Sequence, residues 1–353
     1  MASSFNHALH AFRAFAIINI TAIHAFAWTF IVIREKGYTI APSYWLIDGL
    51  NGVLLHDSTL YFTFISGILF PIILKGKGYP RFFESKFKYV FLPYLFFTTI
   101  FTIFSPFAPD SATSASVIEQ VLNFIGKLSI NLLTGNALWI YWYIPILLVL
   151  YALTPLLEKL PKMPAGKTFS AIIILLPLVA SRVWPEVSWT NYVYFLGAYV
   201  LGLIVGQNYD RTLELIERYW VLLLIIAVLT TLQFFTLPNP ITYGFINLNE
   251  SFWYVQKIAM GALALLWLEK YIKEVPRWLD VLARYAFAIY FIHMIVIMMY
   301  FGTVEALEIN LGDNLNFGIH LLVIYPIIMA ATVGLIFIAK KIFGKYSRSI
   351  IGA

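Results

Sequence analysis

Long hydrophobic stretches, separated by short polar segments, run through this sequence from one end to the other. A helix needs about 20 predominantly apolar residues to cross a bilayer, and the hydropathy pattern predicts ten suitable stretches. They are residues 8–33, 51–74, 87–105, 138–157, 168–184, 190–207, 219–236, 251–271, 284–302 and 317–341. The chain is therefore expected to be all-α, a polytopic membrane protein of about ten transmembrane helices. No soluble domain is expected between the spans, so residues 1–353 should form a single transmembrane domain.

One further helix is expected to lie along the membrane or to re-enter it. Residues 117–134 place apolar and polar side chains on opposite faces of a helix, and they include Glu119 and Lys127. An amphipathic segment of this kind is typical of the interface between lipid and water.

The first predicted span carries two ionisable residues that a lipid-buried helix would avoid, Arg13 and His24. At 3.6 residues per turn their positions differ by about 20° around the helix, so both lie on one face. Along the axis they are separated by about 16 Å. Ionisable groups inside a membrane are costly and usually face a polar interior. The pattern therefore predicts a polar cavity that this face lines.

The composition excludes the soluble classes of protein. Of the 353 residues, 61% are hydrophobic and 12% are charged, and the mean hydropathy is +0.81. Because there is no cysteine, disulfides, thiolate metal sites and a cysteine nucleophile are excluded. The first apolar run has the length of a span and lacks a small-residue cleavage site, so it is expected to remain as a helix.

Basic residues divide unequally between alternate loops of the ten-span arrangement. Nineteen of the 24 lysines and arginines fall on the side that holds both termini. The five on the opposite side are Arg34, Lys36, Lys127, Arg182 and Lys257. Cytoplasmic loops carry an excess of positive charge. Both termini are therefore expected in the cytoplasm, in a multi-pass protein of the cell membrane. This topology accounts for the net charge of +6, so no nucleic-acid partner is expected.

His24, His56 and Asp57 are predicted to share one layer in the outer half of the membrane. His24 lies in that half of the first span, and His56 and Asp57 follow the start of the second by about one and a half turns. A histidine beside a carboxylate is the usual arrangement of a general base, so all three are candidate catalytic residues. The alternative is a pair that merely holds two helices together, but charge buried in lipid favours function.

Basic residues near the cytoplasmic boundary indicate a site for an anion. Arg13 lies one or two turns inside that boundary, and a guanidinium binds phosphate well. Lys86 and Lys88, on the approach to the third span, would add to this site. Each residue has a structural alternative: Arg13 would extend to the lipid phosphates, and the lysines would anchor the span.

Aromatic side chains crowd the outer end of the fourth predicted span. Trp139, Trp142 and Tyr143 follow Asn136 within eight residues. Such a cluster is typical of an interfacial aromatic belt. It would equally provide a stacking surface for a sugar, with Asn136 as a hydrogen-bonding group, and these four residues are candidates for substrate binding.

Three further ionisable residues lie inside predicted spans. Lys257 is expected to pair with Asp57 or Glu250, and it joins the candidate substrate-binding residues. His293 and His320 lie singly on apolar faces, which is more often a structural position. The six histidines are scattered, and HExxH, Cys/His and glycine-rich phosphate-binding motifs are absent from the sequence. No metal site is predicted.

These segments resemble the acyltransferase-3 family, integral membrane proteins that O-acylate surface polysaccharides. The resemblance begins with HAFRAFAIINITAIHAF, where Arg13 and His24 have the family's arginine-to-histidine spacing. It continues through YFTFISGILF (61–70), SKFKYVFLPYLF (85–96), ALWIYWYIPILLVLYALTPLL (137–157) and FAIYFIHMIVI (287–297). The last of these is similar to the family's Tyr-x-x-His span. With the ten-span arrangement, the resemblance covers nearly the whole chain.

The sequence departs from the family pattern at one motif. An Arg-x-x-Arg pair usually precedes the proline of the third span, whereas Lys86 and Tyr89 occupy those positions here. Some family members also append an extracytoplasmic esterase-like domain. None is expected here, so an acceptor should meet the membrane domain directly.

The resemblance implies transfer of an acyl group from acyl-CoA. This co-substrate, expected to be acetyl-CoA, would bind from the cytoplasm with its phosphates near Arg13, and its pantetheine arm would extend toward His24. His24 would then deprotonate an acceptor hydroxyl for attack on the thioester. The acceptor would be a carbohydrate or a lipid-linked sugar. No permanently bound cofactor is expected.

Two other functions use the same features. A transporter or exporter of a glycan or lipid-linked intermediate would use the polar face as a permeation path, without acyl transfer. A membrane-embedded sensor or assembly subunit without turnover would tolerate the loss of His24. The few carboxylates inside the spans give no obvious proton relay, which argues against a proton-coupled transporter.

Overall fold

The computed structural model describes residues 6–104, 116–182, 187–236, 241–244 and 246–353, and its regular structure is almost entirely helical. The α-helices are α1 (His7–Glu35), α2 (Pro42–Leu55), α3 (Thr59–Leu69), α4 (Tyr79–Lys86), α5 (Leu92–Ile103), α6 (Val117–Thr134), α7 (Tyr143–Leu157), α8 (Gly166–Leu175), α9 (Trp189–Gln207), α10 (Tyr209–Thr236), α11 (Leu248–Tyr271), α12 (Arg277–Arg284), α13 (Ala286–Ala306), α14 (Asn314–Phe343) and α15 (Ser347–Ile350).

Shorter elements connect or extend these helices. Two π-helical segments, η1 (Phe70–Leu74) and η3 (Phe87–Phe91), continue α3 and α4. The 3-10 turns are η2 (Lys75–Lys77), η4 (Trp139–Trp142), η5 (Leu160–Lys162), η6 (Leu176–Leu178) and η7 (Gly344–Tyr346). Two short antiparallel strands, β1 (Thr242–Tyr243) and β2 (Ile246–Asn247), precede α11.

The described part of the chain contains eight helical segments long and apolar enough to cross a membrane. The protein is a multi-pass membrane protein, and this number of segments is roughly consistent with the ten predicted spans. The other two predictions, 87–105 and 168–184, correspond to the shorter helix α5 and to α8 with η6. Their last residues, 105 and 183–184, lie outside the described residues. The additional helix predicted over residues 117–134 is α6.

The second predicted span is not one continuous helix from residue 51 to 74. Helix α2 begins at Pro42 and ends at Leu55, and α3 begins only at Thr59. The backbone between them is non-helical, and Asp57 adopts a positive φ of 54°. Aspartate is among the few residues other than glycine that tolerate this region. The hydropathy of the segment does not reveal the break, which leaves His56 and Asp57 at a helix discontinuity.

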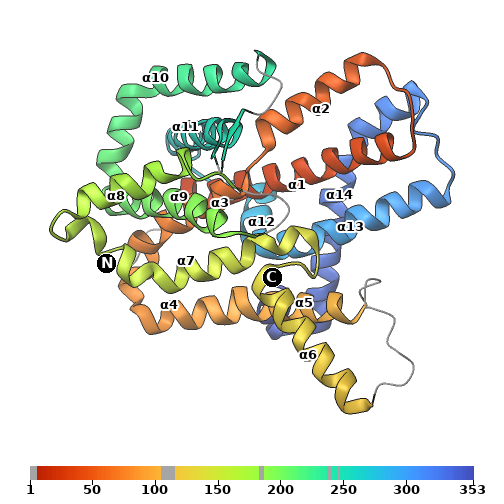
Figure 1. Cartoon of the computed structure of the whole chain (residues 1–353), viewed down its shortest axis with the longest axis horizontal. Helices are drawn as coiled ribbons and strands as arrows, with labels where there is room; N and C mark the ends of the chain where they lie inside the picture. The colour runs from red at the N-terminus through yellow and green to blue at the C-terminus, as the bar shows by residue number, and fades with distance from the viewer. Residues whose placement is uncertain (1–5, 105–115, 183–186, 237–240, 245) are drawn as a thin grey trace.

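Helix α1 runs through the middle of the molecule, with α2, α13 and α14 beside it (Figure 1). Its first turn is capped by Asn6, whose side chain accepts a hydrogen bond of 2.8 Å from the Leu9 amide. Alanines at positions 8, 11, 14 and 25 are buried, and such small residues allow neighbouring helices to approach closely. The helix that carries Arg13 and His24 is thus surrounded by protein.

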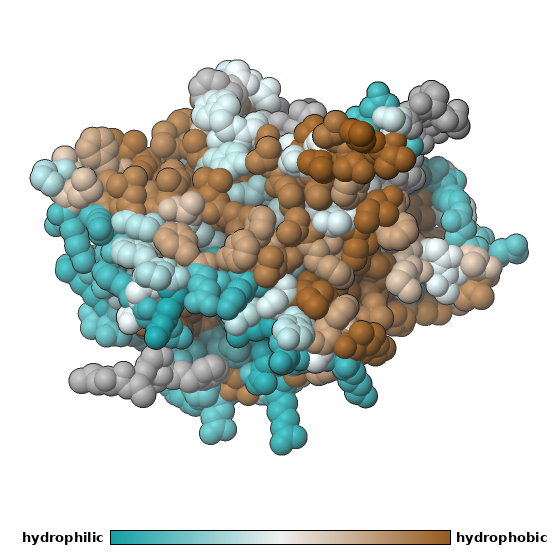
Figure 2. Space-filling model, turned by 90° about the horizontal axis from the view of Figure 1, so that it is seen from below, coloured by the Kyte–Doolittle hydropathy of each residue, from teal (hydrophilic) through white to brown (hydrophobic). Residues whose placement is uncertain are grey.

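The outer surface is largely apolar. Helix α10 bends at Tyr219, whose φ and ψ are non-helical, and its two arms are clear in Figure 1. Apolar side chains of α10 such as Val221, Leu222 and Leu229 are exposed. Figure 2 shows hydrophobic residues covering much of one face, with hydrophilic residues gathered toward its lower left. This distribution is expected of a surface that contacts lipid.

Helices α3 and α9 pack closely because glycines face each other between them. A Cβ on Gly202 would lie 2.3 Å from the Phe64 carbonyl oxygen, and a Cβ on Gly67 would lie 2.4 Å from the Tyr199 carbonyl oxygen. Backbone atoms cannot move aside as a flexible side chain can. The close contact fixes α3, and with it the helix break at Asp57, against α9.

Substituting Gly202→Ala is expected to destabilise the protein by about 2 kcal/mol, the typical cost of overpacking. The matched control is Gly334→Ala in α14, where a Cβ would meet nothing within 4 Å and where alanine is the better helix former. Thermal unfolding in detergent should show a lower midpoint for the first variant and no decrease for the second. Equal midpoints would contradict the close packing of α3 and α9.

Candidate active site

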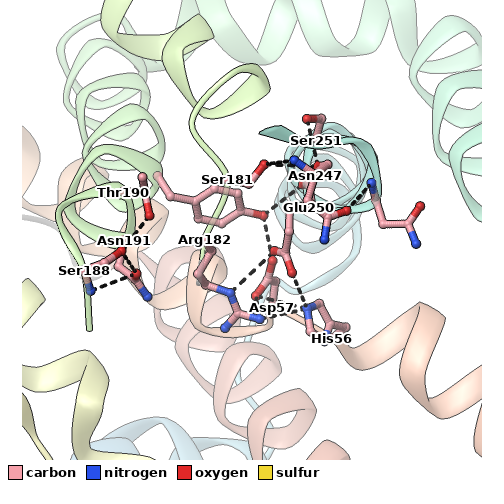
Figure 3. A network of polar contacts seen from close by, with 12 residues as sticks. His56, Asp57, Ser181, Arg182, Ser188, Thr190, Asn191, Asn247, Glu250 and Ser251 are labelled. Atoms are coloured by element: carbon pink, nitrogen blue, oxygen red, sulfur yellow. Dashed lines mark hydrogen bonds and ion pairs between the residues drawn. The ribbon is translucent and has the colours of Figure 1, made fainter. Parts of the chain in front are cut away.

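A network of buried charged groups surrounds the break between α2 and α3 (Figure 3). Arg182 forms an ion pair of 2.8 Å with Asp57 and lies 3.5 Å from Glu250. The Tyr194 hydroxyl donates to the second Asp57 oxygen over 2.6 Å. Asp57 is 6% exposed and Glu250 is 7% exposed, so Arg182 places one positive charge between two buried carboxylates.

His56 is an acceptor in this network. Its Nε2 lies 2.8 Å from Arg182 Nη2, and a guanidinium only donates. The His56 Nε2 atom therefore carries no proton, and its distances of 3.6 and 3.7 Å from Asp57 and Glu250 are not hydrogen bonds. His56, Asp57 and Glu250 present ligand atoms within 4.8 Å of one another. Because the arginine already binds Asp57 and His56, this cluster does not fit a metal ion.

His24 forms its hydrogen bond with a second histidine rather than with a carboxylate. His24 Nδ1 lies 2.8 Å from His293 Nε2, and the two rings stack at 5.1 Å. The carboxylate that is usual beside a general base is therefore not the partner of His24. Asp57 is held instead by Arg182 and Tyr194.

The tautomers of the two histidines follow from their partners. His293 Nδ1 lies 2.9 Å from the carbonyl oxygen of Ile289, so it must carry the proton. In the neutral ring, His293 Nε2 is then an acceptor, and His24 Nδ1 donates to it. This leaves the lone pair on His24 Nε2, for which the described residues provide no hydrogen-bond partner.

His24 lines a cavity of about 360 Å³, which we call the His24 cavity. His56 and Asp57 line the same cavity, so the three predicted catalytic residues meet there. Trp139 and Trp142 form part of the wall. The Trp139 ring lies edge-on to His24 at 5.3 Å. The cavity thus combines an imidazole base with flat aromatic surfaces.

Three predicted substrate-binding residues do not line the His24 cavity. Asn136 is exposed, and Tyr143 is buried with its hydroxyl 2.8 Å from Thr63. Lys257 is 1% exposed and donates to the Leu54 carbonyl over 2.6 Å. The expected ion pair of Lys257 with Asp57 or Glu250 is therefore replaced by a bond to the last turn of α2.

A second cavity, of about 400 Å³, lies toward the N-terminal end of α1, and we call it the Arg13 cavity. Arg13 and Lys86 line it, as the anion-site prediction requires, and Arg348 joins them. No carboxylate is among the described lining residues. Lys88 is not part of this site, since it is exposed and pairs with Glu84 over 2.6 Å.

The two cavities follow each other along α1 and α3. Arg13 and Ser66 line the first, and His24 and Thr59 line the second, but no described residue lines both. Thr63 lies between Thr59 and Ser66 on α3, and its hydrogen bond to Tyr143 is buried. This buried pair forms a layer on α3 between the residues that line the two cavities.

Sequence reasoning missed three residues: His293, which bonds to His24, Arg182 in the charge network, and Arg348 at the Arg13 cavity. His293 has a signal in the sequence, the Tyr-x-x-His segment 290–293, although its lone position indicated a structural role. Arg182 lies in an otherwise apolar segment, which is itself a signal. Arg348 has no signal, because it looks like any basic residue of a cytoplasmic tail.

Comparisons with known proteins identify the family of this chain. Residues 6–341 match a family described as "Acyltransferase domain". Relatives from Staphylococcus aureus strains Mu50 and MW2, each named "Probable poly-beta-1,6-N-acetyl-D-glucosamine export protein", are 21% identical over 254 residues. The alignment covers 65% of this chain and 66% of each relative, just under two thirds of the relatives' length. No solved structure matches. Since the family match covers nearly the whole sequence, the chain belongs to the acyltransferase-3 family.

Proposed function

We propose that the protein transfers an acetyl group from acetyl-CoA to a hydroxyl of a glycan or glycolipid. The donor phosphates bind in the Arg13 cavity, and the acceptor binds in the His24 cavity. Family membership supports acyl transfer as the reaction class. The observation that carries the assignment of a base is the hydrogen-bond chain from His24 through His293 to the Ile289 carbonyl.

This chain prepares His24 to accept a proton. His293 fixes the tautomer of His24 in which Nε2 is unprotonated. The His24 ring lines the cavity. A base positioned in this way contributes about 10²–10⁴-fold to the rate of proton transfer. After His24 Nε2 has accepted a proton, the Nδ1–H of the charged ring still donates to the neutral His293 Nε2, which stabilises the imidazolium.

The Arg13 cavity has the chemistry that the donor phosphates need. Arg13, Lys86 and Arg348 present three cations without a carboxylate among the described lining residues. The axial distance of about 16 Å between Arg13 and His24 suits a donor whose phosphates and reactive thioester are joined by an extended arm. The layer at Thr63 and Tyr143 opens to admit that arm.

The reaction balances as a direct transfer. The acceptor oxygen attacks the thioester carbonyl while His24 Nε2 takes the hydroxyl proton. The carbon–sulfur bond then breaks, the ester forms, and the CoA thiolate receives the proton from His24. Trp139 and Trp142 hold the acceptor by stacking against the apolar face of a sugar.

The excess of basic residues supports the orientation that this scheme requires. In this scheme the protein spans the cell membrane with both termini in the cytoplasm. The Arg13 cavity then faces the cytoplasm, where acetyl-CoA is available. The His24 cavity then lies toward the outer half of the membrane, where a surface glycan or lipid-linked sugar is available.

The test uses purified protein in detergent with acetyl-CoA labelled in the acetyl group. Release of CoA and transfer of the label to oligomers of N-acetylglucosamine, to other oligosaccharides or to lipid-linked sugars are expected, and boiled protein is the control. The absence of both binding and turnover of any short acyl-CoA would contradict the proposal.

Export of a glycan is the second candidate function, because the relatives carry that name. In that case the two cavities would form parts of a permeation path. Reconstituted vesicles discriminate between the two functions. Export predicts movement of a glycan across the membrane without consumption of acetyl-CoA, whereas the leading proposal predicts an ester product whose amount equals the CoA released.

Donor binding is expected to depend on pH through Lys86, which precedes the predicted third span. Burial beside Phe82 and Tyr151, together with the charges of Arg13 and Arg348, lowers the pKa of Lys86 to about 7. A bound anion raises that pKa, so affinity for acetyl-CoA should fall as the pH rises from 7 to 9, by up to about tenfold per pH unit.

The matched variant for this titration is Lys86→Arg, whose guanidinium stays charged throughout the range. Its affinity for acetyl-CoA should be nearly independent of pH between 7 and 9, as measured by isothermal titration calorimetry. A wild-type affinity as constant as that of Lys86→Arg would show that the Lys86 ammonium does not contribute.

A further inference from the structure

The chain beyond α14 returns to the body of the protein and places an arginine at the Arg13 cavity. Helix α15 packs against η3 and α5. Ile351 is 3% exposed, and the Ser347 hydroxyl donates to the Ala353 carbonyl over 2.8 Å. These contacts fix the segment, so the position of Arg348 is set by packing.

Arg348 rests on an aromatic ring from η3. Its guanidinium carbon lies 4.1 Å from the centre of the Tyr89 ring, a cation–π distance. Tyr89 and Arg348 both line the Arg13 cavity. Arg348 is exposed whereas Arg13 is half-buried, so Arg348 stands at the mouth and Arg13 deeper inside.

The charge around this cavity is not balanced by protein groups. Arg13, Lys86 and Arg348 line it, and the described lining residues include no aspartate or glutamate. Three like charges around a cavity of about 400 Å³ repel one another. A single phosphate would leave part of this charge unpaired, whereas a ligand with two or more phosphate groups would neutralise it.

We propose that Arg348 is a phosphate-binding residue of the donor site, and that the site selects donors that carry more than one phosphate group. Tyr89 is the positioning residue that holds its guanidinium at the mouth. This inference rests on the proposed function, because it assigns a ligand to the same cavity. It adds a binding residue from the opposite end of the chain and a chemical reason for choosing a nucleotide-linked thioester over a simple one.

The test compares two donors on the purified full chain. In Arg348→Ala, the KM and the Kd for acetyl-CoA should rise about tenfold, as expected for the loss of a charge-assisted hydrogen bond. The kcat should not change, and the KM for S-acetyl-pantetheine, which has no phosphate, should not change either. Tyr89→Ala should shift the KM for acetyl-CoA in the same direction by a smaller factor, and Tyr89→Phe should not.

Lys345→Ala is the matched control. Lys345 is exposed and lies over the Tyr346 ring at 5.1 Å, but it does not line the cavity. Its removal should leave both donors unaffected. If Lys345→Ala weakened acetyl-CoA binding as much as Arg348→Ala, general surface charge would account for the effect and the proposal would be overturned.

The remaining outcomes separate this inference from the function on which it rests. Equal acetyl-CoA affinity in wild type and Arg348→Ala would overturn this inference alone, and so would an equal loss for both donors. Failure of the wild-type protein to bind acetyl-CoA at all would overturn the proposed function as well. A further experiment compares lipid binding by wild type and Arg348→Ala in nanodiscs of neutral phosphatidylcholine and of anionic phosphatidylglycerol. If Arg348→Ala changed only binding to the anionic lipid, the site would belong to a lipid phosphate instead of the donor.

Discussion

Replacing His24 with asparagine is expected to lower the rate of acyl transfer about 10²–10⁴-fold while the protein remains folded. The asparagine amide nitrogen takes the place of His24 Nδ1 and can still donate to His293 Nε2. The atom that is lost is Nε2, the proposed base. The measurement is kcat for labelled acetyl-CoA, with thermal unfolding as the check on stability.

His293 provides the control that separates positioning from packing. In His293→Gln, the amide oxygen replaces Nε2 and can still accept from His24, so much of the activity should remain. In His293→Leu, a side chain of adequate size fills the space but accepts nothing, so the tautomer of His24 is no longer fixed. We expect a loss of about tenfold or more in the leucine variant only.

Two results would contradict this role for His24. Activity of His24→Asn close to wild type would remove it as the base. Equal losses in His293→Gln and His293→Leu would mean that the second histidine contributes packing and not a hydrogen bond. If His24→Asn abolished glycan export in vesicles that consume no acetyl-CoA, export would become the leading function.

Replacing Arg182 with methionine is expected to destabilise the protein by about 3–5 kcal/mol, the usual cost of breaking a buried ion pair. The substitution leaves Asp57 and Glu250 without their cation, and their side chains are 0% and 10% exposed. The chain would expose or protonate these carboxylates, and the break between α2 and α3 would lose the contact that holds it.

The matched control is Arg34→Met, because Arg34 forms an ion pair with Asp48 but its side chain is 53% exposed. An exposed pair contributes at most about 1 kcal/mol. Combining Arg182→Met with Asp57→Asn and Glu250→Gln should restore part of the lost stability, since neutral amides then replace the two carboxylates that lost their cation. Thermal unfolding of the four proteins in one detergent provides the comparison.

A loss of activity without a loss of stability in Arg182→Met would give the charge network a different role. If Arg182→Met unfolded at the wild-type temperature but lost acyl transfer, then Asp57 and His56 would act in the reaction, as the sequence predicts for them. A parallel loss of stability and activity that the triple variant partly reverses would instead identify the network as the support that holds the helix break.

The sequence alone determined the class of the protein and the helix on which its site is built. Long apolar stretches have few alternatives to transmembrane helices, because backbone groups in lipid must be satisfied within the segment. The face shared by Arg13 and His24 follows from helical periodicity alone, and the two cavities lie along α1 at these residues. Lys86 was also found from sequence, because it precedes a span whose start is clear.

The tertiary structure decided which side chains act together. His24 bonds to a histidine 269 residues away, Asp57 is held by Arg182 rather than paired with His24, and Arg348 reaches the cavity by the packing of α15. Hydropathy sums neighbouring residues and periodicity describes one helix, so neither contains the contacts between helices. Those contacts depend on how α3 and α13 pack against α1 and how α9 packs against α3, and that packing is a property of the whole chain.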